Sequence, residues 1–562
     1  MTSDKKNISL LADLFVKSGL TDIVISPGSR NAPIILSFVN RAGINAFSIV
    51  DERSAAFFAL GLALNSKKTV AIACTSGSAV LNYASAISEA YYQKIPLLVI
   101  TADRPINLID IGDGQTIRQR NIYENYIKKS YQLPATLDTD AEFEAAEKII
   151  NEAINGCVFP QAGPIHINIP FDEPIYGTTK KHVVGKLAFR DNSTSIISKS
   201  LLKEVVTKWN NSNKVLIIVG QWGVSQKLVE ILEKICQNSN TVVLTETTSN
   251  LFSLDFIDTI DNIVSSINDN EIELFKPDII ISFGGQIVSK MIKKFLRDNK
   301  PQAHWHISPS GEELDTYFSL TIVIKYDEFA FFESVIPNLL PVKSSYFAQW
   351  TNRKNKVSMR KDEYISKIEY SDFKVFDSIF KQLPENSVLH LGNSTPVRYS
   401  QLFGSEKNIN YNSNRGVSGI DGQVSTAAGF AYASDKLNVL ITGDLGFFYD
   451  SNGLMNKYLK PNLKIIVINN SGGGIFRFIS GPDTSENLDE FFVAKHNWSA
   501  EYICKAFNVN YTKADNTKDL ENILPYFLKN ESVNTELLEI FTPSEINAKV
   551  LREYFKFIKK AE

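Results

Sequence analysis

Residues 437–450, LNVLITGDLGFFYD, and residues 463–476, LKIIVINNSGGGIF, decide how this chain of 562 residues folds. Each stretch begins with an apolar run of strand length, and each run ends at glycine and polar residues. Asn470 comes 26 positions after Asp444, which leaves room for one helix and one returning strand. Because the carboxyl ends of parallel strands meet at one edge of a sheet, we expect these two side chains to lie close together.

The same alternation of strand-like and helix-like segments runs through most of the chain. Short apolar runs are separated by segments of helical periodicity, a succession typical of βαβ units with a parallel sheet covered by helices. We expect strands at 22–25, 46–50, 69–73 and 96–101, then at 214–220, 241–245, 278–284 and 303–307, and finally at 387–391, 437–442 and 463–468.

The chain is too long for one hydrophobic core, so the pattern predicts several domains. We expect an α/β protein with three doubly wound parallel-sheet domains at residues 1–185, 186–350 and 351–562. The asparagine- and serine-rich stretch 191–200 is expected to link the first two domains, and the C-terminal segment to complete the third sheet.

Composition excludes several classes of protein. The net charge is only −3, which gives no electrostatic case for binding nucleic acid. The start, MTSDKKNISL, does not have the pattern of a signal peptide, and no apolar run approaches the ~20 residues that span a bilayer. The four cysteines and six histidines show no metal-ligand spacing. We expect a cytoplasmic protein with reduced cysteines.

The paired turns suggest a particular site chemistry. A carboxylate and an amide oxygen suit Mg²⁺ or Mn²⁺ beside phosphate oxygens, and glycine allows backbone to approach a diphosphate. A Gly-Asp pair alone is a weak signal, but here it stands with Asn469-Asn470 after a second strand. Together they resemble the signature of thiamine-diphosphate-dependent enzymes. The resemblance implies a pyrimidine domain, a middle domain and a diphosphate domain, with the metal held by Asp444, Asn470 and Gly472. Leu445 stands where that signature usually has glycine.

The resemblance also implies roles for residues outside the signature. Glu52 would be the catalytic carboxylate at the aminopyrimidine ring, although a first-turn acid is also what a helix dipole favours. Ile420 would support the bent cofactor, although it could equally be an ordinary core isoleucine. The residues implied to bind the cofactor are Pro27, Thr75, Asn82, Ser394, Ile420, Gly443, Asp444, Leu445, Asn470 and Ile475.

Several loops together look like those of one family within this group. They are SPGSRNAP (26–33), DERSAAFFALG (51–61), TSGSAVLN (75–82), TADRP (101–105), GNSTPVR (392–398) and NRGVSGIDG (414–422). The family is the menaquinone-pathway SEPHCHC synthases, where SEPHCHC is 2-succinyl-5-enolpyruvyl-6-hydroxy-3-cyclohexene-1-carboxylate. This resemblance implies a transferase that decarboxylates 2-oxoglutarate on thiamine diphosphate and adds the succinyl carbanion to isochorismate. It also implies a homodimer or homotetramer whose active site lies between subunits.

Both implied substrates are anionic, so an arginine-rich pocket is expected. Any one arginine could equally be a solvated surface charge, as could Arg118 in the QTIRQ loop. Two positions depart from the family: Gly114 and Ser471 each stand where asparagine is common. By resemblance, isochorismate would meet Ser29, Arg30, Arg104 and Gln115, the middle domain would add Lys290, and Arg398, Arg415 and Phe476 would face the oxo acid or cofactor.

Two other functions compete with this interpretation. Acetolactate synthases and pyruvate oxidases share the thiamine chemistry and usually carry FAD, but the pair Gly284-Gly285 lacks a GxGxxG pattern. A nucleotide-binding oxidoreductase or a non-catalytic α/β binding protein would also fit the sheet pattern. The loop after the first expected strand, SPGSR, argues against the oxidoreductase and the binding protein, because it contains a single glycine and no GxGxxG pattern.

Overall fold

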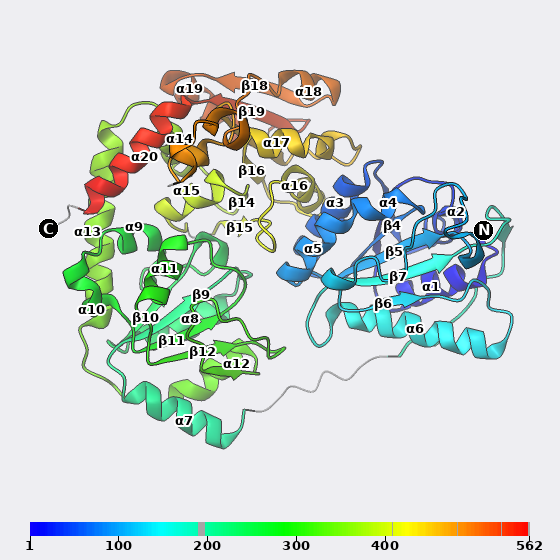
Figure 1. Ribbon diagram of the computed structural model, residues 1–562, viewed down its shortest axis with the longest axis horizontal. Coiled ribbons are helices and arrows are strands. Elements are labelled where there is room, and N and C mark those ends of the chain that lie inside the picture. Colours follow the sequence, from blue (N-terminus) through cyan, green and yellow to red (C-terminus); the bar gives the residue numbers. More distant parts are fainter. Residues whose placement is uncertain (189–196, 407, 480, 530, 560–562) are drawn as a thin grey trace. The chain divides into compact units, whose positions relative to one another are not determined.

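A computed structural model describes residues 1–188, 197–406, 408–479, 481–529 and 531–559 (Figure 1). It contains three parallel sheets with helices packed on them, so the expected α/β class with three doubly wound sheet domains is confirmed. The strands form at the expected places because parallel sheets are buried on both faces, which demands nearly continuous runs of valine, isoleucine and leucine. Most of the predicted linker, residues 191–196, lies outside the described residues.

The first sheet carries the N-terminal half of the candidate site. Helices α1 and α6 pack on one face of it, and α3 and α5 pack on the other. Its strand order is β3 (Asn45–Ser48), β2 (Asp22–Ile25), β4 (Val70–Cys74), β5 (Leu97–Asp103), β7 (Ile165–Pro170) and β6 (Ser130–Gln132). Its helices are α1 (Lys6–Lys17), α2 (Ala32–Phe38), α3 (Glu52–Ser66), α4 (Ser78–Asn82), α5 (Ala84–Gln93) and α6 (Asp140–Val158), and β1 (Thr2–Ser3) pairs antiparallel with β8 (Thr178–Thr179).

The middle sheet is built in the same way. Its strand order is β10 (Thr241–Leu244), β9 (Val215–Val219), β11 (Ile279–Phe283), β12 (Ala303–Ile307) and β13 (Ile322–Ile324). Its helices are α7 (Lys199–Asn210), α8 (Gln226–Cys236), α9 (Ile260–Ser265), α10 (Ile272–Phe275), α11 (Lys290–Asp298) and α12 (Glu328–Val335).

The third sheet carries the paired turns, and the C-terminal segment completes it as expected. Its strand order is β15 (Asn410–Asn412), β14 (Val388–Leu391), β16 (Asn438–Gly443), β17 (Leu463–Asn469), β19 (Glu536–Phe541) and β18 (Asn510–Ala514). Strands β16 and β17 are therefore neighbours, so their carboxyl ends meet. The helices of this region are α13 (Tyr346–Lys367), α14 (Asp372–Phe380), α15 (Thr395–Phe403), α16 (Gln423–Tyr432), α17 (Asp444–Tyr449), α18 (Glu501–Ala506), α19 (Thr517–Phe527) and α20 (Ser544–Lys559).

Contacts group the described residues into two compact units. The first unit comprises Met1–Asn192 together with Asn414–Asp435 and Tyr449–Leu463, and the second comprises the rest. Helix α16 thus packs with α3, although it follows α3 by hundreds of residues. Both helices are buried on every side along most of their length, from Ser54 to Ala63 in α3 and from Gln423 to Ala431 in α16. A helix that is apolar all round requires such complete burial.

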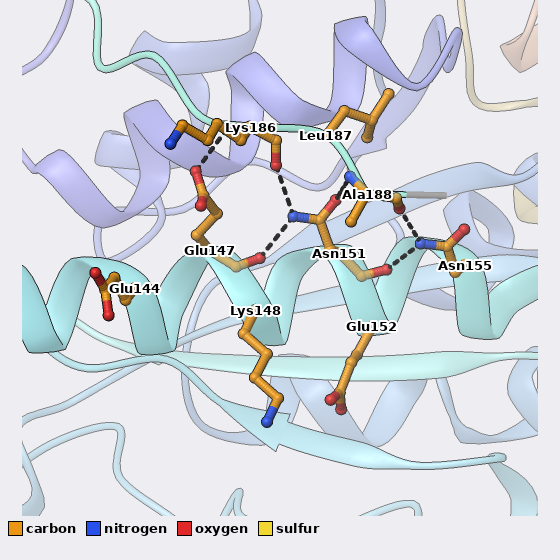
Figure 2. A pocket seen from close by; sticks show the side chains of 9 residues that line it. All are labelled: Glu144, Glu147, Lys148, Asn151, Glu152, Asn155, Lys186, Leu187 and Ala188. Carbon is orange, nitrogen blue, oxygen red and sulfur yellow. Dashed lines mark hydrogen bonds between the residues drawn. The ribbon is translucent and has the colours of Figure 1, made fainter. Parts of the chain in front are cut away.

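Residues 186–188 lie alongside α6, as Figure 2 shows. The side-chain amide of Asn151 binds the backbone of this segment with both of its ends. Its Nδ2 donates to the Lys186 carbonyl at 3.0 Å, and its Oδ1 accepts from the Ala188 N–H at 2.8 Å. Asn155 adds a bond to the Ala188 carbonyl at 2.7 Å. The pocket beside these residues is lined mainly by polar and charged side chains of α6, and none of the predicted site residues lines it.

Two further features bear on the setting of the site. Across the described ranges, no helix is both long enough and apolar enough to cross a membrane. The four cysteines are all buried free thiols, which agrees with the expectation that they are reduced.

Candidate active site

The ends of β16 and β17 come together as expected. Asp444 is buried, and its Oδ2 accepts a hydrogen bond of 2.8 Å from the backbone N–H of Gly472. Its Oδ1 accepts one of 2.6 Å from the N–H of Leu445. Two backbone donors therefore fix the carboxylate between the two turns, and each oxygen retains a second lone pair for a ligand.

Asn470 presents an oxygen with no partner. Its side chain is buried, and its Nδ2 donates to Asp372 Oδ2 at 3.1 Å. Its Oδ1 has no hydrogen-bond partner among the described residues. This buried acceptor is therefore available to a ligand. Burial raises the pKa of Asp372 to about 6; hydrogen bonds from Thr542 and Asn470 oppose the rise, and the charge of Asp444 adds to it.

The turn after β17 requires glycine. Gly472 has a φ of 137°, and a Cβ at this position would collide with the carbonyl oxygen of Val493. Ser471 before it adopts a φ of 64°, a conformation that asparagine tolerates better than serine. The Ser471 N–H donates to Asn469 Oδ1 at 3.1 Å, which holds this strained residue in place.

These residues fit a divalent cation beside a diphosphate. One carboxylate, one amide oxygen and one backbone carbonyl form a hard oxygen set, which leaves room for phosphate oxygens and water. The Gly472 carbonyl already accepts a bond of 2.9 Å from the Gly474 N–H but has a second lone pair. Within the described ranges no group of three or more histidine, cysteine, aspartate or glutamate side chains is placed to hold a metal ion.

His496 also reaches this cluster. Its Nε2 lies 3.4 Å from Asp444 Oδ2, and its ring stacks on Trp498 with centroids 4.5 Å apart. The Trp498 N–H donates to His496 Nδ1 at 3.1 Å, which helps to hold the ring in place. Sequence reasoning missed His496, because its segment lies beyond the recognised loops.

The remaining predicted cofactor residues of this unit lie on the same two turns or on α15. A Cβ at Gly443 would meet only open space, as a close approach by a diphosphate requires. Ile475 is buried, whereas Phe476 is partly exposed and packs against Phe492 with centroids 6.0 Å apart. Ser394, at the N-terminal cap of α15, has a φ of 72°, a strained value typical of functional turns.

Two cations were predicted to meet substrate in this unit. Arg398 on α15 is partly buried, and its Nε has no hydrogen-bond partner in the described part of the chain. Burial lowers the pKa of Arg398, and the carboxylates of Asp261 and Glu246 oppose this. Lys290 begins α11 and is exposed. Arg398 therefore has the surroundings of an anion site, and Lys290 has those of a surface residue.

Glu52 lies in the first unit, at the start of α3. Burial raises the pKa of its carboxyl; a backbone hydrogen bond opposes the rise, and the neighbouring Asp51 adds to it. The charge of Glu52 in turn adds to the burial that raises the pKa values of Cys74 and Tyr83. A partly buried carboxyl among groups that stay neutral is poised to share a proton.

A second glutamate holds the loop that carries Arg415 and Ile420. The carboxylate of Glu89 on α5 accepts from the N–H groups of Gly416 at 2.6 Å and Val417 at 2.8 Å. Arg415 is buried, whereas Ile420 is 38% exposed. Ile420 is thus not a core isoleucine, which favours the predicted contact with a ligand.

The predicted isochorismate residues Ser29 and Arg30 follow the carboxyl end of β2, and Arg104 follows that of β5. Arg30 is buried; its guanidinium donates to the Phe171 carbonyl at 3.0 Å and pairs with the exposed Glu173 at 3.0 Å. Ser29 hydrogen-bonds the Tyr176 hydroxyl at 3.0 Å. The Arg30 N–H donates to Thr75 at 3.2 Å, which joins the two loops.

The loop 110–119 completes this edge. Gln115 Nε2 donates to the Ser76 carbonyl at 3.2 Å, and Arg104 donates to the Gly114 carbonyl at 3.2 Å. At Gly114 the backbone therefore binds the arginine, where the family often has an asparagine side chain. Arg118 is exposed and pairs with Asp110 at 2.7 Å, as a surface charge does. Pro27 and Asn82 are also exposed.

Two supporting residues beyond His496 were not predicted: Asp372, which accepts from Asn470 Nδ2 at 3.1 Å, and Glu89, which accepts from the Gly416 N–H at 2.6 Å. Each is a buried acid whose partner is distant in sequence, and no motif marks them. A buried acid that reads as an ordinary helix or strand residue has no sequence signal of its own.

Family models match most of the chain. Residues 7–126 match a model described as the N-terminal binding domain of thiamine pyrophosphate enzymes, and residues 392–535 match the corresponding C-terminal binding domain. Residues 189–391 match a model described as the middle domain of thiamine pyrophosphate. Thiamine pyrophosphate is another name for thiamine diphosphate, so the thiamine-enzyme resemblance is confirmed.

Curated relatives match nearly the whole length. The chain is 44% identical to a 2-succinyl-5-enolpyruvyl-6-hydroxy-3-cyclohexene-1-carboxylate synthase of Christiangramia forsetii, over 97% of each chain. It is 43% identical to a synthase of the same name from Flavobacterium johnsoniae, over 96% of each chain. A third, from Porphyromonas gingivalis, is 39% identical over 99% of this chain and 98% of its own.

Proposed function

The chain belongs to the family of 2-succinyl-5-enolpyruvyl-6-hydroxy-3-cyclohexene-1-carboxylate synthases, and from that premise we propose how its residues carry out the reaction. The enzyme decarboxylates 2-oxoglutarate on thiamine diphosphate and adds the succinyl group to isochorismate, a step of menaquinone biosynthesis. The observation that carries the assignment of residues is the meeting of Asp444, Asn470 and Gly472, with one Asn470 oxygen left without a partner.

Asp444, Asn470 and the Gly472 carbonyl hold Mg²⁺ or Mn²⁺ in this proposal. These residues would hold the cation beside the diphosphate, and the open space at Gly443 would allow the backbone to lie close to that group. When bound, thiamine diphosphate supplies the electron sink that lets a 2-oxo acid lose carbon dioxide. Ile475 and Ile420 present apolar surface to the cofactor. The further residues proposed to contact it are Pro27, Thr75, Asn82, Ser394 and Leu445.

Glu52 holds and moves a proton at the pyrimidine ring nitrogen of the cofactor. The raised pKa of its carboxyl supports this role, because a protonated or proton-sharing carboxyl is needed near neutral pH. An amide at this position could accept the same contacts but could not transfer the proton.

The arginines bind the carboxylates of the substrates. Arg30 is buried, and its ion-pair partner Glu173 is exposed, so a substrate carboxylate can replace that partner at small cost. Arg104 and Gln115 share this edge with Ser29. Arg398 and Arg415 bind the oxo acid, supported by the partly buried guanidinium of Arg398 with its free Nε, and Lys290 and Phe476 are further contacts.

We also propose that the working enzyme is a homodimer or homotetramer in the cytoplasm. The residues for the pyrimidine ring and those for the diphosphate lie in different compact units, one of each per chain. A symmetric assembly would bring the pyrimidine half of one subunit to the diphosphate half of another. Free buried cysteines suit a reducing compartment.

The decisive experiment measures carbon dioxide release from 2-oxoglutarate by the purified protein with thiamine diphosphate and Mg²⁺. Release that requires the cofactor, together with product formed from isochorismate, is the expected result. Release from pyruvate but not from 2-oxoglutarate would retain thiamine chemistry and overturn the substrate assignment. Omission of Mg²⁺ after treatment with chelator tests the metal separately.

A further inference from the structure

The amide of Asn470 can serve a cation in only one of its two orientations. An asparagine side chain has an acceptor end and a donor end, and only the oxygen can ligate a metal. Here Nδ2 donates to Asp372 Oδ2 at 3.1 Å, and Oδ1 has no hydrogen-bond partner in the part of the chain that the structure describes. The orientation of the ligand is therefore set by its contact on the opposite side.

Asp372 is itself held rigidly. It is the first residue of α14 and only 2% exposed. Its Oδ1 accepts from the Thr542 hydroxyl at 2.5 Å, and its backbone N–H donates to Asn547 Oδ1 at 2.8 Å. Asn547 Nδ2 donates in turn to the same Thr542 hydroxyl at 3.2 Å. This closed ring of three residues fixes the carboxylate in place before any ligand arrives.

We propose that Asp372 is a positioning residue for the metal ligand Asn470, which it holds with the oxygen toward the cation. The inference rests on the proposed metal site. A carboxylate accepts hydrogen bonds and donates none, so a flipped Asn470 would set two oxygens against each other and turn its NH₂ group toward the cation. Partners of metal ligands commonly have this function, and their loss costs about 10- to 100-fold in metal affinity.

A purely structural role for Asp372 makes a different prediction. An acid in the first turn of a helix stabilises that helix through the dipole, without reference to any metal. Loss of that role would lower stability and would weaken metal binding to the same extent whether or not Asn470 is present. The two roles therefore differ in their dependence on Asn470.

Glu539 provides a matched control. It is a buried acid, on β19, and it holds Asn469, the neighbour of the ligand, through a bond of 2.8 Å. Its carboxylate also accepts from the Ala500 N–H and from the Ser499 and Tyr511 hydroxyls. Glu539→Gln thus disturbs a buried acid beside the site without releasing the amide of Asn470.

The test is a double-mutant cycle for Mn²⁺ binding to the full-length protein with saturating thiamine diphosphate, read from the electron paramagnetic resonance signal of free Mn²⁺. We expect Asp372→Ala to weaken Mn²⁺ binding about 10-fold or more. In an Asn470→Ala background the same substitution should change the affinity less than 2-fold, because its target is gone. Glu539→Gln should leave the affinity within about 3-fold of wild type.

Equal losses in both backgrounds would overturn the positioning role and leave the metal site standing. Absence of Mn²⁺ binding by the wild-type protein would instead remove the proposed site and the inference with it. If Asp372→Ala does not fold, Asp372→Asn takes its place in the cycle. That variant keeps the shape of the side chain but can offer an NH₂ group to Asn470, and we expect it to weaken Mn²⁺ binding only when Asn470 is present.

Discussion

The carboxylate of Asp51 accepts a hydrogen bond of 2.8 Å from the side-chain amide of Asn452, which lies 401 positions later in the chain. The other oxygen of Asp51 accepts from the Ser54 N–H at 2.9 Å and caps α3. Arg53 donates to the Tyr449 carbonyl at 2.7 Å and lies over the Tyr449 ring. The residues on both sides of Glu52 are thus anchored to the segment that follows β16, which fixes the position of the proposed catalytic acid.

Asn452→Ala should therefore lower the turnover number several-fold, because the first turn of α3 loses one of its anchors. We expect a stability loss of about 1–3 kcal/mol, typical of a bond to a charged group. Steady-state kinetics and thermal unfolding measure the two effects. The control is Asn65→Ala. This substitution removes a hydrogen bond from a side-chain amide at the far end of the same helix to the Ala433 carbonyl. Equal kinetic losses in both variants would argue against a specific role for the Asn452 contact.

Glu52→Gln should abolish turnover while thiamine diphosphate still binds. Loss of a positioned acid–base group costs about 100- to 10,000-fold in rate. Carbon dioxide release from 2-oxoglutarate gives the rate, and calorimetric titration gives the affinity for the cofactor. Turnover at the wild-type rate would remove Glu52 from the mechanism.

Asp444→Ala should weaken the binding of Mg²⁺ and of thiamine diphosphate together, because in the proposed site Asp444 would hold the cation beside the diphosphate. Titration of each in the presence and absence of the other measures this coupling. The exposed Asp435, shortly before β16, serves as the control, and Asp435→Ala should bind both normally. A normal cofactor affinity in Asp444→Ala would refute the metal assignment.

Arg398→Ala should raise the KM for 2-oxoglutarate about 10- to 100-fold, as expected for loss of a charged hydrogen bond of about 1.5–3 kcal/mol. The exposed Arg118, paired with Asp110, provides the comparison. Arg118→Ala should leave KM unchanged. A similar KM for wild type, Arg398→Ala and Arg118→Ala would mean that Arg398 on α15 does not bind the oxo acid.

The stability of the protein should depend on pH through Asp450. Burial raises the pKa of its carboxyl from 3.8 to about 7, and hydrogen bonds from Ser425 oppose this rise. A raised pKa in an acid means that the folded protein binds the proton more tightly than the unfolded chain. The stabilising contribution is therefore complete below pH 4 and is lost as the pH rises through 7. Asp450→Asn should become more stable relative to wild type by on the order of 2–4 kcal/mol between pH 4 and pH 8.

Thermal unfolding of Asp450→Asn and wild type at several pH values measures this difference. Asp435→Asn, at an exposed site, should show no such trend. A constant difference between Asp450→Asn and wild type across this range would mean that Asp450 is ionised throughout.

Sequence patterns predicted the sheets well because buried parallel strands leave continuous apolar runs. The strands 22–25 and 303–307 agree with β2 and β12 to the residue. The meeting of Asp444 with the turn after β17 followed from strand adjacency alone. Such features depend on neighbours in sequence or on a regular topology, which a single sequence displays.

The supporting residues could not be predicted in this way. Asp372 stands at the start of a helix, where an acid is common, and its contact with Asn470 spans 98 positions. The contact from Glu89 to Gly416 spans 327. Long-range pairs of buried polar groups depend on how elements pack, and packing leaves no local periodicity. The roles assigned to the site residues and the predicted domain boundaries stay predictions.

The packing of α3 against α16 has a consequence for the growing polypeptide on the ribosome. Helix α3 is buried on every side, and α16, the helix that covers one of its faces, is encoded near residue 430. At about 5–20 residues per second, the roughly 360 residues between the two helices take about 20–70 s to synthesise. During that interval one apolar face of α3 stays uncovered in the nascent chain, so we expect the emerging protein to depend on a chaperone that shields this face until α16 has been synthesised.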